Sequence, residues 1–287
     1  MIVSHLHRFV FFKPIKVAGT SIEAALWKSC DKNTDTYTGS NIISEISHNE
    51  WDLSSSNNWH NKRCLDRQDA EKYFIKHNKK HLIKKLRDSL QISHVNVVDP
   101  IFFEHSSPVM ASDHSSLFKG YTSVSVIRNP FDMLVSYYWW SFNVEETVFE
   151  SFNERYKKNK KLVSSLRPRR SDNINILKDK MEHFYSLPAS FNNSYRKADE
   201  TMTVLEWISC WQNEFFLEDI DIWIKFEDLV ESFKTACLTL GIDNYQIPKF
   251  KTSHKKIKIP FDNYFTNTLK DSTRFHFKET FEKFSYQ

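Results

Sequence analysis

Short apolar runs separated by polar stretches outline the expected elements of this chain. Residues 9–12 (FVFF), 94–98 (HVNVV) and 123–127 (SVSVI) are too short for helices and rich in β-branched or aromatic residues, so each predicts a buried strand. Residues 219–226 (DIDIWIKF) alternate between polar and apolar positions, which predicts a further strand. Apolar residues at helical spacing predict helices that begin near Thr20, Pro130 and Glu227 or cover 69–90 and 201–216. Strands that alternate with helices indicate an α/β fold.

Composition narrows the class of protein. Of the 287 residues, 40% are hydrophobic and 15% aromatic, which is enough for a sizeable core. The net charge of +4 suits an anionic ligand but is too small for a dedicated nucleic-acid binder. The four cysteines lie far apart without zinc-ligand spacing, so we expect free thiols in a reducing compartment. No apolar run is long enough to span a membrane, which indicates a cytoplasmic protein, or a Golgi-lumen protein only if an anchor has been removed.

The first candidate for chemistry is the segment that follows the strand at 9–12. Its loop contains Gly19 as a breaker, and Thr20 and Glu23 have capping-box spacing, so a helix should begin here. A strand, a loop and a helix N-terminus form a phosphate-binding arrangement, because the first helical turn offers unpaired N–H groups and the positive end of the dipole. Lys16 adds a full positive charge. The loop does not match the nucleotide-binding pattern GxxxxGK[ST], since its lysine precedes its single glycine.

The second candidate follows the strand at 123–127. Arg128 stands at the carboxyl end of this strand, Asn129 is a good N-cap, and Pro130 suits the first position of a helix. Ser136 lies about two turns into that helix. A planar guanidinium binds phosphate oxygens in pairs, and a hydroxyl adds one more hydrogen bond.

Both segments resemble motifs of the sulfotransferases that use 3′-phosphoadenosine 5′-phosphosulfate (PAPS). Residues 16–21 resemble the loop PKTAGTS, although Val17 replaces the usual threonine and Ile15 is inserted, while residues 128–138 resemble RNPxDxxxSxY. The resemblance implies that the 3′-phosphate is bound by Arg128 and Ser136. It also implies that the 5′-phosphosulfate is bound by Lys16, Val17, Ala18, Gly19, Thr20 and Ser21. Later segments, EDL at 227–229, LGI at 240–242 and the basic KTSHKKIK at 251–258, resemble the same family more weakly.

A histidine after the strand at 94–98 is the candidate base. In carbohydrate sulfotransferases of the bacterial type a histidine commonly follows such a strand, and His105 resembles it. An unperturbed imidazole pKa of about 6.5 suits general-base catalysis. Glu104 could orient this histidine or replace it, and His114 is a rival.

These observations together predict a PAPS-dependent sulfotransferase. The expected fold is a P-loop-like three-layer α/β fold with a mostly parallel central sheet flanked by helices, in one domain over residues 1–287. Lys16 and His105 would be catalytic, no metal is needed, and PAPS would deliver its sulfuryl group to a hydroxyl, with a carbohydrate as the favoured acceptor. Two alternatives remain: a nucleoside or sugar kinase of P-loop type, and a non-catalytic nucleotide-binding protein.

Overall fold

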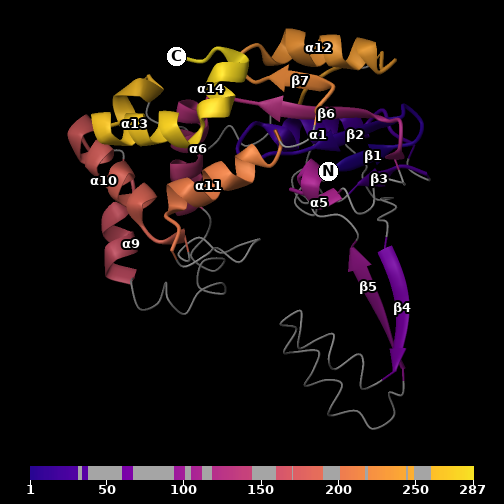
Figure 1. Ribbon diagram of the computed structural model, residues 1–287, viewed down its shortest axis with the longest axis horizontal. Coiled ribbons are helices and arrows are strands. Elements are labelled where there is room, and N and C mark those ends of the chain that lie inside the picture. Colours follow the sequence, from indigo (N-terminus) through magenta and orange to yellow (C-terminus); the bar gives the residue numbers. More distant parts are fainter. Residues whose placement is uncertain are drawn as a thin grey trace.

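The structure is a computed structural model, shown in Figure 1. It describes residues 1–31, 34–37, 60–66, 94–100, 105–111, 118–143, 160–169, 171–189, 201–216, 219–243, 245–248 and 260–287.

A five-stranded sheet is the centre of the fold. Its strands lie in the order β3-β1-β2-β6-β7, with the bounds β1 Ile2–Ser4, β2 Phe9–Phe12, β3 Thr36–Tyr37, β6 Thr122–Ile127 and β7 Ile222–Lys225. β1 is antiparallel to both β2 and β3, whereas β2, β6 and β7 run parallel to one another. The α/β class is therefore confirmed, and three of the four predicted strands lie in this sheet. The central sheet was predicted to be mostly parallel, but it is mixed, because only two of its four pairings are parallel.

The run at 94–98 forms a strand outside this sheet. β5 (His94–Pro100) pairs with β4 (His60–Asp66) in a separate two-stranded antiparallel sheet, with His94 opposite Asp66 and Pro100 opposite His60. Figure 1 shows this hairpin apart from the main sheet. The predicted strand is therefore confirmed, but its partner is β4 and not a strand of the central sheet. An apolar run indicates a strand, but it does not specify which strand will pair with it.

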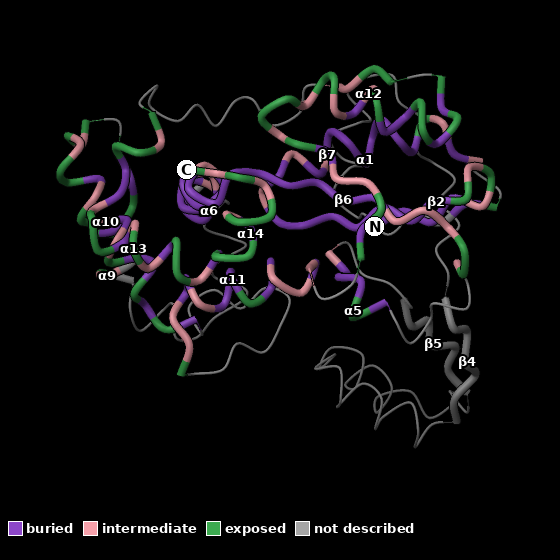
Figure 2. The backbone as a smooth tube through the Cα atoms, turned by 45° about the horizontal axis from the view of Figure 1, so that its top comes forward, coloured by how far each residue is buried: buried purple, intermediate pink, exposed green. Residues whose placement is uncertain are grey.

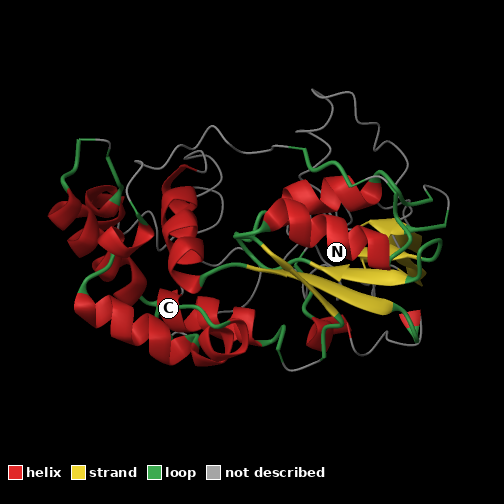
Figure 3. Cartoon of the chain, turned by 90° about the horizontal axis from the view of Figure 1, so that it is seen from above, coloured by secondary structure: helices red, strands yellow, loops and turns green. Residues whose placement is uncertain are grey.

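Helices lie on both sides of the strands (Figure 3). Their bounds are α1 Gly19–Trp27, α5 Pro108–Ala111, α6 Pro130–Asn143, α9 Lys160–Leu166, α10 Ile174–Ser186, α11 Val204–Asn213, α12 Leu229–Thr239, η3 Phe261–Tyr264, α13 Asn267–His276 and α14 Lys278–Phe284. The helices predicted after Thr20, after Pro130, over 201–216 and after Glu227 are confirmed as α1, α6, α11 and α12. The helix predicted over 69–90 lies outside the described residues. Among those that are described, no helix is long and apolar enough to cross a membrane.

The two faces of the sheet are buried in two separate cores. Phe9 and Phe11 of β2 point to one face and pack with α1 and α12, while Val10 and Phe12 point to the other face. This alternation follows from the two-residue period of a strand. Figure 2 shows β1, β2 and most of β6 as buried.

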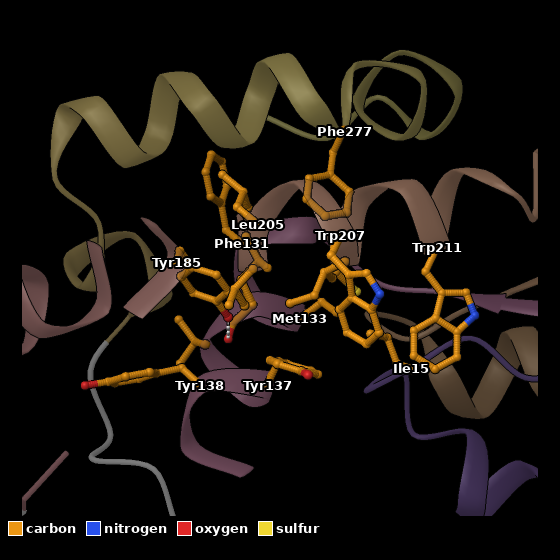
Figure 4. Close-up of a cluster of buried hydrophobic side chains, with 14 of the residues drawn as sticks. Ile15, Phe131, Met133, Tyr137, Tyr138, Tyr185, Leu205, Trp207, Trp211 and Phe277 are labelled. Carbon is orange, nitrogen blue, oxygen red and sulfur yellow. Dashed lines mark hydrogen bonds between the residues drawn. The ribbon is translucent and has the colours of Figure 1, made fainter. Parts of the chain in front are cut away.

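The second core is unusually aromatic. It contains Phe131 and Tyr138 of α6, Tyr185 of α10 and Trp207 of α11, seen together in Figure 4. The Tyr185 hydroxyl donates to the Leu134 carbonyl oxygen at 2.6 Å, so its polar atom is satisfied where the ring is buried. The apolar residues of α11 and of the turn after it face this core, because Leu205, Ile208, Trp211 and Phe215 are all buried. This core fixes α11 and also α6, the helix that carries Ser136.

Candidate functional site

The loop after β2 has a backbone suited to an anion. Lys16 and Ala18 have positive φ angles of 55° and 63°, which are uncommon for residues other than glycine. Ala18 is the N-cap of α1, and its carbonyl oxygen accepts the N–H groups of Ser21 and Ile22 at 3.0 and 3.3 Å. A left-handed residue before helical ones turns successive N–H groups to one side and forms an anion-binding nest. In the described part of the chain, the N–H groups of Gly19 and Thr20 donate to no protein group.

The predicted capping box is not formed. Thr20 lies inside the helix rather than at its N-cap, because α1 begins at Gly19. The carboxylate of Glu23 turns inward instead, where Oε2 lies 2.6 Å from Lys13 Nζ and Oε1 lies 2.7 Å from the amino group of Met1. These charged donors bind a carboxylate more strongly than a backbone N–H does. The capping-box prediction was therefore wrong, although the predicted start of the helix differs by one residue only.

Gly19 is required by the path of the Lys13 side chain. Lys13 is 3% exposed and crosses above Gly19 to reach Glu23. A Cβ atom on residue 19 would lie 2.5 Å from Lys13 Cγ, well inside van der Waals contact. The glycine therefore permits close approach of a side chain at the helix N-terminus.

The sheet brings the second motif to this loop. Because β2 and β6 are parallel neighbours, with Phe12 opposite Ser125, the segments that follow them leave the same edge of the sheet. The Arg128 guanidinium donates from Nη1 to the Lys16 carbonyl oxygen at 2.8 Å. Two residues that are 112 positions apart in the sequence are thus in direct contact. The structure therefore brings the two motifs together.

Arg128 is held in a buried and charged environment. Its Nε and Nη2 atoms lie 2.8 and 2.6 Å from Asp132 Oδ2, and its guanidinium carbon is 3.9 Å from the centroid of the Phe226 ring. Burial lowers the pKa of Arg128, and the carboxylates of Asp132 and Glu227 oppose this shift. With the bond to Lys16, these contacts occupy three of the five guanidinium N–H donors.

Ser136 lies on the face of α6 that borders the loop. Asp132, Ser136 and Trp140 are spaced four residues apart, so they share one helix face, and all three are half-buried. The Lys16 ammonium lies 4.6 Å from the centroid of the Trp140 ring at one end of this row. At the other end, the Lys16 carbonyl oxygen accepts from Arg128, which binds Asp132. Ser136 therefore lies between two contacts of the same lysine. The side chain of Asn129 accepts from the Phe131 N–H at 2.9 Å, which confirms the predicted N-cap.

His105 contacts Lys13, the residue at which the loop begins. Its Nδ1 atom is 2.9 Å from the Lys13 carbonyl oxygen, and its ring packs against the edge of Trp211, with 5.6 Å between the centroids. A carbonyl oxygen can only accept, so Nδ1 carries the proton of the neutral imidazole and Nε2 carries the lone pair. This is the tautomer that a general base at Nε2 requires. Both Glu104 and His114 fall outside the described residues, as does the basic segment at 251–258.

The structure refines the contribution of individual residues. The side chain of Val17 is fully buried in the core, so only its backbone could face a ligand. Ser21 is also buried, with 9% of its surface exposed. Lys13, Asp132 and Trp140 were missed by the sequence reasoning. The positions of Asp132 and Trp140, four residues before and after Ser136, were a signal that could have found them.

No protein-family model, curated protein or solved structure matches this chain. Across the described ranges, no group of three or more histidine, cysteine or acidic side chains is placed to hold a metal ion.

Proposed function

We propose that this protein is a sulfotransferase that moves a sulfuryl group from PAPS to a hydroxyl, with a carbohydrate as the favoured acceptor. The observation that carries the proposal is the direct contact between Arg128 and the Lys16 carbonyl oxygen at 2.8 Å. This contact places the buried guanidinium of Arg128 beside the loop that carries Lys16 and leads into the N-terminus of α1. PAPS has two anionic groups on one nucleoside, and the proposal assigns one to each of these positions. A P-loop-like three-layer fold belongs to the same proposal, since Lys16 and Arg128 follow the parallel strands β2 and β6.

In the proposed donor complex, the 5′-phosphosulfate accepts from the N–H groups of Gly19 and Thr20 and from the Lys16 ammonium. Lys16 must leave the Trp140 ring to reach it, which costs only about 0.5–1 kcal/mol at a half-exposed site. Arg128 and Ser136 bind the 3′-phosphate. The phosphate adds to the guanidinium contacts already made with Asp132, which keep the Arg128 side chain in one orientation.

The proposed reaction is an in-line displacement at sulfur. His105 Nε2 takes the proton of the acceptor hydroxyl as its oxygen bonds to sulfur. The bond from sulfur to the bridging oxygen breaks, and the developing negative charge on that oxygen is stabilised by Lys16 and the loop N–H groups. The product nucleotide is adenosine 3′,5′-bisphosphate. Lys16 and Arg128 supply the positive charge, so the mechanism uses no metal.

The first experiment tests the donor site. Adenosine 3′,5′-bisphosphate should raise the melting temperature and bind in calorimetry, and ATP should bind much more weakly because it lacks the 3′-phosphate. Arg128→Ala should weaken bisphosphate binding by about 2–5 kcal/mol, and Ser136→Ala by about 0.5–1.5 kcal/mol. Equal binding of ATP and the bisphosphate would contradict the proposal and favour a kinase.

Two variants control the Arg128 result. Arg128→Ala alone removes the positive charge beside the Asp132 carboxylate, so the double variant Arg128→Ala/Asp132→Asn restores the wild-type net charge. It should still bind weakly, because the guanidinium itself is missing. Arg274→Ala removes an exposed arginine whose Nη1 lies 3.9 Å from Asp271 Oδ1, and it should bind the bisphosphate normally.

The second experiment tests turnover. Radiolabelled PAPS, offered with a panel of carbohydrate and other hydroxyl acceptors, should label at least one of them. His105→Ala should lower this rate about 10²–10⁴-fold while binding the bisphosphate normally. Bisphosphate binding without transfer to any acceptor would favour a non-catalytic nucleotide-binding protein.

A further inference from the structure

Two side chains at the C-terminal end of helix α11 contact the segment that carries His105. Trp211 and Glu214 are three residues apart at the C-terminal end of this helix, so they lie on the same side of it. Trp211 packs against the His105 ring with the two ring planes at 85°. Ser107 lies two residues after His105, and its hydroxyl donates a hydrogen bond to Glu214 Oε2 at 2.7 Å.

Ser107 links Glu214 to the backbone of the His105 segment. This serine is fully buried, and its oxygen also accepts the N–H of Met110 at 3.3 Å, so it caps the short helix α5. The Ser107 hydroxyl therefore donates one hydrogen bond, to Glu214, and accepts one, from the Met110 N–H. The chain just after His105 is thereby fixed to α11.

The far end of α11 is fixed independently. Thr203 and Glu206 form a complete capping box at its N-terminus, and Phe215, just beyond the helix, is 1% exposed. The position of Trp211 and Glu214 is consequently set by the core rather than by the loop. The Lys13 carbonyl, the hydrogen-bond partner of the imidazole, is held because Lys13 follows β2 directly and its side chain binds Glu23.

We propose that Trp211 and Glu214 are positioning residues for His105. Together with the Lys13 carbonyl, they hold the imidazole with its proton on Nδ1 and its lone pair on Nε2. The value of this arrangement for catalysis rests on the proposed function, in which Nε2 is the base. The geometric part concerns the resting protein and needs no substrate. Helix α11, whose inward face forms part of the core, thus has a second role at its C-terminal end.

The tautomer of His105 is the direct readout. In long-range ¹H–¹⁵N NMR spectra, with the His105 signals identified by their absence from His105→Ala, the neutral ring should be protonated at Nδ1. Glu214→Ala should lower the Nδ1-protonated fraction, and it should lower kcat about tenfold to 100-fold without changing the affinity for adenosine 3′,5′-bisphosphate. Glu214→Gln keeps an oxygen that accepts from Ser107, so it should restore both the tautomer and the rate.

Matched variants separate positioning from stability. Glu206→Ala removes the capping box at the other end of α11, so it should lower the melting temperature by a few degrees and leave the His105 tautomer unchanged. Trp211→Leu should lower the Nδ1-protonated fraction as Glu214→Ala does. Ser107→Ala breaks the hydrogen bond to Glu214 from the other side and should also lower the Nδ1-protonated fraction, so it keeps the test available if Trp211→Leu does not fold.

The outcomes are distinguishable from those of the proposed function. An unchanged tautomer in folded Glu214→Ala, or a failure of Glu214→Gln to restore it, would overturn the positioning proposal. A His105 tautomer that changes in Glu214→Ala and is restored in Glu214→Gln supports the positioning proposal. If the wild-type protein nevertheless sulfates no acceptor, that failure counts against the enzyme function alone.

Discussion

The buried ion pair beneath the loop leads to a quantitative prediction. Lys13 Nζ and Glu23 Oε2 are 2.6 Å apart, and their side chains are 4% and 0% exposed. Breaking a buried pair by removing one partner is costly, because the remaining charge stays in a poorly hydrated site. We therefore compare Lys13→Met, Glu23→Gln and the double variant. Methionine keeps a long unbranched stem above Gly19, and glutamine keeps the shape of glutamate.

The expected magnitudes follow from what each variant leaves behind. Lys13→Met leaves the Glu23 carboxylate with the amino group of Met1 at 2.7 Å, so its cost should lie near the lower end of about 3–5 kcal/mol. Glu23→Gln leaves two ammonium groups facing a neutral amide, and its cost should lie near the upper end of that range. In the double variant neither member of the pair is charged. Its cost should fall short of the sum of the two single costs by at least about 2 kcal/mol.

Guanidinium chloride unfolding, followed by circular dichroism, measures these costs. The exposed pair Lys278 and Glu282, whose atoms are 3.7 Å apart with side chains 72% and 66% exposed, provides a matched control. Its variants Lys278→Met and Glu282→Gln should each change stability by less than about 1 kcal/mol. If the costs of Lys13→Met and Glu23→Gln add to within about 0.5 kcal/mol in the double variant, the two charges are not coupled and the reasoning is refuted.

Three further predictions concern other parts of the structure. Gly19→Ala should destabilise the protein by about 1–3 kcal/mol despite the better helix propensity of alanine, because its Cβ meets Lys13 Cγ; a raised melting temperature would contradict this. Hydrogen bonds at the helix N-cap lower the pKa of Glu206 below its usual 4.5, so the stability it contributes is present above that value and is lost as the pH falls below it. The melting temperature of Glu206→Gln should therefore fall less between about pH 5 and pH 3 than that of the wild type, and equal slopes would refute this. Burial raises the pKa of Cys237 to about 12, whereas Cys210 is exposed, so peptide mapping after iodoacetamide treatment should find Cys210 alkylated first; equal rates would contradict the structure.

Much of the local structure could be predicted from short stretches of sequence. The apolar run at 9–12 became a strand with the predicted bounds, and the strand predicted at 123–127 is one residue longer in the structure. Asn129 and Pro130 set the start of α6 because a side-chain oxygen can cap a helix and proline suits its first turn. These preferences act over a few residues, so a short stretch is sufficient to reveal them.

Other predictions failed where a distant partner was stronger than a local one. Glu23 has the spacing of a capping box with Thr20, but the Lys13 ammonium offers its carboxylate a charged donor instead. Helix α1 begins at Gly19, and Ala18 is its N-cap. The left-handed backbone of Lys16 could not be foreseen either, because non-glycine residues adopt it only when surrounding contacts compensate for the strain.

The sequence by itself determined which residues of the candidate site carry charge and which elements present them. Lys16 follows a strand and Arg128 follows another, and both were identified from local patterns. Only the tertiary structure decided that β2 and β6 are parallel neighbours, so that Arg128 reaches the Lys16 carbonyl oxygen, and that β5 pairs elsewhere. The physical reason is the distance along the sequence over which each interaction acts. Hydrophobic period and capping are properties of neighbouring residues, whereas strand pairing and buried ion pairs join residues whose separation in the sequence carries no signal of their contact.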